Sequence, residues 1–239
     1  MLNAMLMASE SAFTINGPLV VASWEMFGMT WNLTESVIVQ WIVIALLGVL
    51  FFVLGRKLKV VPTSRRQALA EWLVTFVVDM VDGTMGEKYK SYRPYVGMLI
   101  IYVVVCNLIG LLGLRSPTAD VSVTATLAII TFFMTQYNRA KTGGVKGYLK
   151  SFIDPLPFML PSNIIGEISN PVSMALRLFG NMVAGMVIGG LIYWALGSFM
   201  PPIFIPAVAS LYFDIFSGVI QAYIFTMLTM SYISNAECE

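Results

Sequence analysis

The sequence predicts an all-α integral membrane protein, with five membrane-crossing helices and one interfacial amphipathic helix. Of its 239 residues, 58% are hydrophobic and 11% are charged, which is more apolar surface than one soluble core of this length needs. Uncharged runs long enough to cross ~30 Å of hydrocarbon as helices, which takes ~20 residues, recur along the chain. One segment between the first two runs is amphipathic instead.

The composition also excludes several function classes. A net charge of +1 leaves no basic excess with which to hold nucleic acid. Histidine is absent, and the spacing of Cys106 and Cys238 fits neither a metal site nor a disulfide framework. We therefore expect no metal, no cofactor and no catalytic residue. A glycine-rich phosphate loop is also missing, so this chain by itself is not expected to bind or hydrolyse ATP.

The predicted elements follow in order. Residues 1–35 form an outward-facing N-terminal segment, and 36–239 form a single membrane domain. No Lys or Arg precedes residue 56, so we expect the first helix to direct insertion. The crossing helices are expected at 36–55, 94–114, 121–138, about 161–196 and about 203–233. A loop rich in Lys, Gly and Pro, residues 139–157, follows the third.

The amphipathic segment at about 64–86 places Leu69, Trp72 and Phe76 on one helical face, with its charges elsewhere. This pattern predicts a helix along the membrane interface; a helix packed as in a soluble protein is the alternative. The last two apolar segments measure ~54 and ~46 Å at 1.5 Å per residue. Both exceed the bilayer thickness, so we expect a steeply tilted hairpin over about 161–234.

The basic residues predict the orientation. Of the 14, eight lie between Arg56 and Arg93, and four lie between Arg139 and Lys150. Because short cytoplasmic loops are enriched in Lys and Arg, both clusters and the C-terminus are expected in the cytoplasm.

Arg177 stands in a stretch with no other charge between Glu167 and Asp214. An arginine at bilayer depth costs at least ~2.5–3.5 kcal/mol, so something must offset or use it. Residues spaced by three and four place it on one polar helix face, and the last helix repeats the pattern. The first face holds Asn170, Ser173, Arg177 and Asn181, and the second holds Ser210, Asp214, Ser217 and Gln221.

A turn near Met200 would place Arg177 at the depth of Gln221. Asp214 would then lie on the outer side of the arginine and Glu167 on the inner side. This layout predicts two polar half-paths that a fixed cation keeps apart, with Asn181 and Gln221 as neutral neighbours of the arginine. A structural ion pair between Arg177 and Asp214 is the alternative.

Three stretches carry a family resemblance: NPVSMALRLFGNMVAG at 170–185, QAYIFTMLTMSYIS at 221–234 and TADVSVT at 118–124. Over about residues 35–235 the chain resembles subunit a of the F-type ATP synthase. The resemblance implies a non-catalytic stator subunit of a bacterial plasma membrane complex. Its partners would be a ring of c subunits, peripheral-stalk b subunits and membrane lipid, and it would conduct H⁺ or Na⁺ through two half-channels. By motif match, Arg177 is the essential family arginine, Asn181 its polar neighbour and Gln221 its hairpin partner.

One departure from the family concerns the outer path. Many relatives carry a titratable residue where Met186 stands, so here Asp214 either works alone with water or helps to carry a hydrated sodium ion. Three further polar residues have two possible roles. They either line an ion path, or form interhelical hydrogen bonds and helix caps: Asn107, Ser122 and Asp120. Two rival functions remain: a self-contained secondary transporter with an arginine–carboxylate gate, for which repeated halves are expected but not found, and a structural scaffold.

Overall fold

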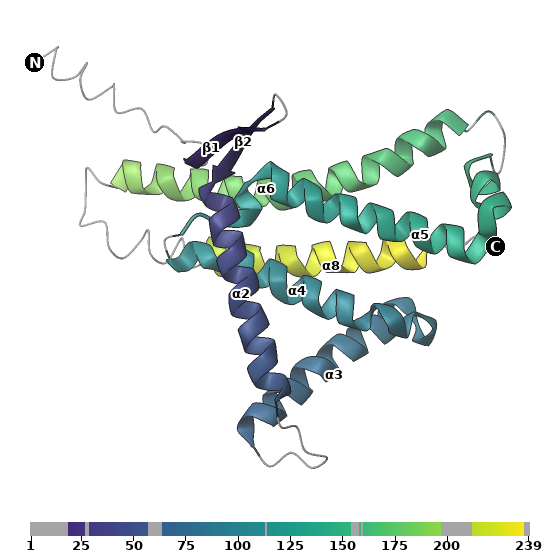
Figure 1. Ribbon diagram of the computed structural model, residues 1–239, viewed down its shortest axis with the longest axis horizontal. Helices are drawn as coiled ribbons and strands as arrows, with labels where there is room; N and C mark the ends of the chain where they lie inside the picture. The colour runs from purple at the N-terminus through teal and green to yellow at the C-terminus, as the bar shows by residue number, and fades with distance from the viewer. Residues whose placement is uncertain are drawn as a thin grey trace, which may run out of the picture.

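The computed structural model describes residues 19–26, 29–56, 64–112, 114–153, 158, 160–196 and 212–236 (Figure 1). Within these ranges the chain is helical apart from one β-hairpin and short connections. Four described helical segments are long and apolar enough to cross a membrane: Glu35–Gly55, Glu87–Leu112, Leu160–Leu191 and Ile215–Ser234. An all-α membrane protein is thereby supported. The prediction of a fifth crossing helix at 121–138 is not among these four and stays a prediction.

The N-terminal hairpin pairs β1 (Val20–Met26) antiparallel to β2 (Met29–Thr34), with Trp24 opposite Trp31. Sequence analysis assigned no structure to this segment. The available signal was two runs rich in β-branched and aromatic residues, separated by a two-residue connection that contains glycine. The backbone N–H of Glu35 donates to the carbonyl of Leu19 at 3.0 Å, which joins the hairpin to the start of the first helix.

The next three helices are α2 (Glu35–Gly55), α3 (Arg65–Met85) and α4 (Arg93–Leu108), which Figure 1 shows as the sides of a triangle. α3 falls where the interfacial helix was expected. Ser64 Oγ accepts the N–H of Gln67 at 3.3 Å, and Gly86 ends the helix at φ 81°. α4 ends six residues before the predicted 114, because the chain tightens into a 3₁₀ turn, Ile109–Leu112.

α5 (Val121–Ile153) corrects the predicted loop at 139–157. The chain stays helical through Arg139 and on to Ile153, with one break at Gly144. Gly144 adopts φ 61° and ψ −178°, a conformation that side chains with a Cβ rarely adopt. Lys and Ala between 139 and 143 favour helix, so the glycine, and not the lysines, marks the interruption.

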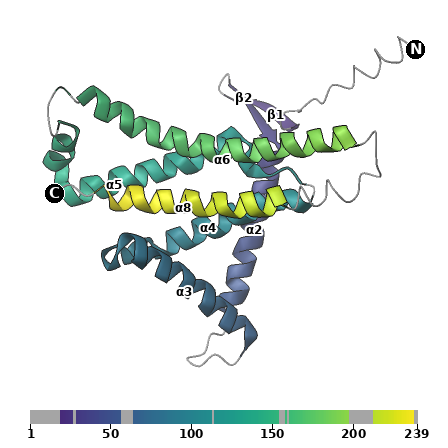
Figure 2. The same cartoon turned by 180° about the vertical axis from the view of Figure 1, so that it is seen from behind.

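α6 (Leu160–Leu196) and α8 (Gly218–Ser234) run along the length of the molecule, whereas α2 runs across it (Figures 1 and 2). A π-helical turn, Tyr212–Ser217, precedes α8. The 37 residues of α6 span ~55 Å, and Pro171 lies inside the helix. α6 contacts α5 and α8, and α8 also contacts α4. The turn of the predicted hairpin and residues 203–211 lie outside the described residues.

The centre of the bundle is a buried apolar cluster that includes Leu99 and Val103 of α4, Leu178 of α6 and Phe225 of α8. The α6 residues in it occupy one side of that helix. The opposite side of α6 is not covered by the part of the chain that the structure describes.

Candidate functional site

The polar stripe of α6 lies at the edge of its uncovered side. Asn170, Ser173, Arg177 and Asn181 are all exposed, whereas Leu178, next to the arginine, is fully buried. The guanidinium of Arg177 makes no hydrogen bond or ion pair with any side chain in the described part of the chain. Large apolar side chains of the same two helices are also exposed, among them Leu176 of α6 and Ile220 and Tyr223 of α8. The arginine is thus a cation on a bare, mostly apolar surface.

Asn181 and Gln221 join the two helices beside the arginine. Asn181 Nδ2 donates to Gln221 Oε1. Gln221 is 2% exposed, and its own Nε2 has no partner among the described atoms. The two neutral neighbours expected for Arg177 are therefore bonded to each other. Their pairing leaves the donors of Arg177 available.

One end of the site is built around the start of α8. Asp214 lies in the π-helical turn and Ser217, half-buried, ends it; the side chain of Asp214 and all of Ser210 lie outside the described residues. Asn107 is fully buried beneath this point. Its Nδ2 donates to the carbonyl of Gly218, and its Oδ1 accepts from Thr118 Oγ1, both at 2.7 Å. Asn107 thus joins α4 to the first residue of α8.

Asp120 and Ser122 lie together at the start of α5. Asp120 Oδ1 accepts the backbone N–H of Ser122 at 3.0 Å, as in a helix cap. The hydroxyl of Ser122 is on an exposed residue. The helix cap gives Asp120 a structural role that requires no ion path.

On the other side of Arg177, Glu167 is held by two residues of α5. Its Oε2 accepts from Arg139 at 2.7 Å, and its Oε1 accepts from Gln136 at 2.5 Å. The two charged side chains are 17% and 15% exposed, so the pair is largely buried. It lines a cavity of about 160 Å³ between α5, α6 and the end of α8, where Thr131, Thr135, Asn170 and Asn235 supply further polar groups. The cavity has room for several water molecules.

Comparison of the sequence with known proteins shows the family to which the chain belongs. The family model described as ATP synthase A chain matches residues 37–234. The chain belongs to this family. It is 37% identical over 219 residues to a protein from Propionigenium modestum named ATP synthase subunit a, sodium ion specific, covering 85% of this chain and 74% of the relative. It is also 38% identical to ATP synthase subunit a 2 of a Bradyrhizobium strain (85% and 89% covered) and 34% identical to ATP synthase subunit a of Bacillus subtilis (88% and 94% covered).

Membership of the ATP synthase A-chain family places the chain in the membrane sector of a complex that couples ion transport to ATP synthesis. The apolar helices agree with a multi-pass membrane protein. The sequence prediction does not include the two residues that hold Glu167, which are Arg139 and Gln136. The signal is available: in a helix that continues from 121 past 138, Arg139 shares a face with Thr135 and Gln136, at spacings of four and three residues.

Proposed function

We propose that this chain is the ion-translocating stator subunit of a rotary F-type ATP synthase, with two offset half-channels that meet a c ring at Arg177. The observation that carries the proposal is the exposed guanidinium on an apolar face that no described part of the chain covers. Intramembrane charges ordinarily face the interior of their own bundle or a water-filled cavity. A cation on an outer face calls for a partner that brings the opposite charge.

That partner is proposed to be the carboxylate of a c subunit. At ~4 Å and an effective dielectric constant of about 20, the attraction to Arg177 is worth about 4 kcal/mol. The guanidinium stays protonated in any setting, so it attracts each emptied carboxylate and repels the transported cation. The same charge therefore guides rotation and prevents ions from leaking between the half-channels.

The inner half-channel is proposed to pass through the cavity beside Glu167 and Arg139, and the outer one to approach from Asp214 and Ser217. Both basic clusters and the C-terminus would then face the cytoplasm of a bacterial cell. Peripheral-stalk b subunits would hold the chain against the turning ring. Each ion that crosses 100 mV supplies ~2.3 kcal/mol, which the subunit directs into rotation.

The transported ion is proposed to be H⁺ or Na⁺. The sodium-specific name belongs to the Propionigenium modestum relative, and Met186 leaves Asp214 as the titratable residue at its expected depth. Sodium stimulation of ATP hydrolysis by the intact complex, together with protection of the ring from carboxylate-modifying reagents, would identify Na⁺. Sodium-independent hydrolysis would identify H⁺.

The test of the proposed function is Arg177→Ala in the complex reconstituted into vesicles. ATP-driven ion pumping is expected to be lost while the subunit still assembles, because the substitution removes a charge from an exposed position. Arg66→Ala is the matched control, since it removes an exposed arginine from α3, far along the chain from the site. Normal coupled pumping by the Arg177→Ala complex would overturn the proposal. Ion flux through vesicles that hold this chain without a ring would favour the secondary transporter instead.

A further inference from the structure

A second hollow in the molecule lies away from the Arg177 face, between α2, α3 and α4. It is a groove of about 730 Å³, within the roughly 300–1,000 Å³ that is usual for small-molecule sites. Lys90 and Arg93 are the charged residues that line it. All its other lining residues are apolar, among them Phe51 of α2, Val74 of α3 and Met98 of α4.

The groove has a closed floor and an open mouth. Its floor is the close contact between α3 and α4, where a Cβ added to Gly97 would lie 3.1 Å from a methyl group of Val77. Val77 is 6% exposed. Val74 and Met98, by contrast, are 59% and 48% exposed, so the side chains of the described residues do not fill the groove. Something apolar must cover these walls at bilayer depth.

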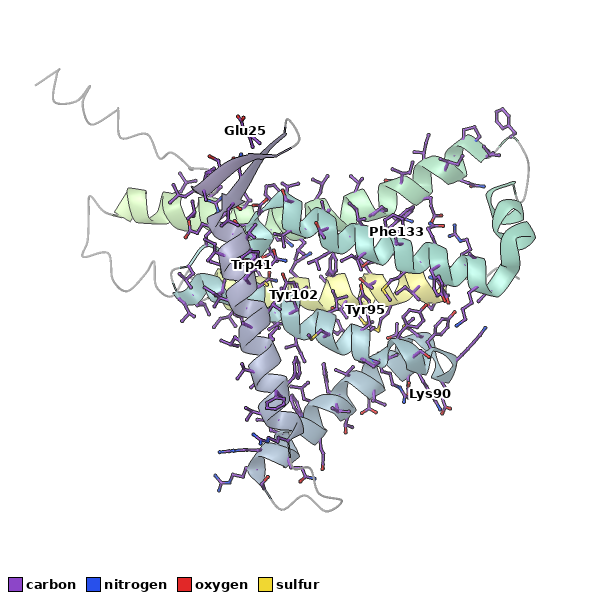
Figure 3. The ribbon with its side chains drawn as sticks, in the orientation of Figure 1. Glu25, Trp41, Lys90, Tyr95, Tyr102 and Phe133 are labelled. Carbon is purple, nitrogen blue, oxygen red and sulfur yellow. The ribbon has the colours of Figure 1, made fainter. Side chains whose placement is uncertain are left out.

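The two cations gather at one end of the groove, at the beginning of α4. Figure 3 shows Lys90 at the end of the bundle where α3 and α4 meet. Lys90 pairs with Glu87 at 2.8 Å, and its side chain is 54% exposed. Arg93 donates to both carboxylate oxygens of Asp82 from Nε and one terminal nitrogen. Neither carboxylate lines the groove.

These pairs leave donors for a further anion. Arg93 has a second terminal nitrogen that Asp82 does not engage, and Lys90 has three N–H donors for a single bond to Glu87. An exposed ion pair such as Lys90–Glu87 contributes little to stability, so Lys90 can turn toward a phosphate at small cost. The end of the groove therefore offers cationic donors beside an apolar channel.

We propose that this groove binds an anionic phospholipid, with an acyl chain along the apolar walls and the headgroup phosphate at Lys90 and Arg93. Lipid tails are as apolar as leucine side chains, so the walls accept any acyl chain and cannot select among lipids. Selection falls to the headgroup, because basic pockets between membrane helices attract anionic lipids. The site is independent of the role of Arg177.

The test uses the complex that contains this chain, in bilayers of equal parts phosphatidylglycerol and phosphatidylcholine. One lipid or the other carries a photoactivatable diazirine on its acyl chain, and crosslinked peptides are identified by mass spectrometry. We expect labelling of residues 73–78 and 97–101, several-fold stronger with phosphatidylglycerol. Lys90→Gln with Arg93→Gln is expected to remove this preference, by up to about fivefold for each cation. Arg65→Gln with Arg66→Gln is the control, because it removes two exposed cations that do not line the groove.

Met98→Trp gives a second variant that leaves every charge in place and fills the groove from an exposed position. It is expected to reduce the capture of both lipids, and it keeps the test decisive if the double variant fails to assemble. Equal capture of the two lipids by the unaltered complex would overturn the proposal. So would crosslinks from these segments to a neighbouring protein chain in place of lipid. ATP-driven pumping, measured in parallel, separates failure of this site from failure of the proposed ion path.

Discussion

The buried hydrogen bonds of Asn107 predict how much the junction between α4 and α8 contributes to the stability of the protein. Thr118→Val removes the donor that the described part of the chain supplies to Asn107 Oδ1, at 2.7 Å in the present structure. Valine keeps nearly the same shape, so the change is a loss of hydrogen bonds: the one to Asn107 and the one between the hydroxyls of Thr118 and Ser116, also 2.7 Å long. Asn107 and Thr118 are both 0% exposed, and an orphaned buried acceptor costs about 1–3 kcal/mol. We expect the free energy of unfolding to fall by that amount.

Thr126→Val is the matched control for this change. Thr126 is exposed, and its hydroxyl donates at 2.7 Å to the carbonyl of Ser122, one turn earlier in the same helix. Its replacement is expected to change stability by no more than about 0.5 kcal/mol, as for most surface substitutions. Thermal unfolding of the reconstituted complex, followed by release of this subunit, compares the two variants. Equal losses for Thr118→Val and Thr126→Val would refute the assignment of Asn107 as a buried joint.

Two further substitutions follow from other contacts. Glu167→Gln and Arg139→Gln each remove one side of a largely buried ion pair, so each alone is expected to destabilise the protein by up to about 3 kcal/mol. The double variant is expected to lose less than the sum of the two single losses. Additive losses in a thermal double-mutant cycle would show that the pair is not coupled. Gly97→Ala is expected to cost about 1 kcal/mol, because the new Cβ would lie 3.1 Å from Val77. The loss should largely disappear in a Val77→Ala background, and its persistence there would contradict the close helix contact.

Local signals explain which elements could be predicted. α3 and α6 begin and end within one residue of their expected bounds. Ser64 caps α3, Gly86 stops it, and Pro161 stands in the first turn of α6. The extension of α5 escapes prediction because glycine and lysine are common in loops, although here a single glycine interrupts a helix that otherwise continues. The N-terminal hairpin escapes prediction because its two short strands give a weaker signal than the long apolar runs that follow.

In the site, too, some features could be predicted from the sequence and others could not. Helical periodicity predicts that Asn170, Ser173, Arg177 and Asn181 share a face. It does not predict what covers that face. For Asn107 the sequence leaves path lining and interhelical bonding open, because both need a polar residue inside an apolar helix. Its partners come from the tertiary structure: the placement of α8 beside α4 supplies Gly218, and the turn before α5 supplies Thr118. The contact between Arg139 and Glu167 likewise depends on tertiary structure, since 28 residues separate the two.

The pairing of Asn181 with Gln221 bears on why the arginine needs something beyond this chain. Gln221 offers a carbonyl oxygen near the depth of Arg177, and a neutral acceptor there could have satisfied the guanidinium. Asn181 donates to that oxygen instead. The pair joins α6 to α8 while the arginine, one turn away, keeps its donors. An arginine at bilayer depth costs at least ~2.5–3.5 kcal/mol, and no side chain in the described part of the chain engages this one. Under the proposed function, the moving carboxylate of the ring would supply the anion that stabilises it.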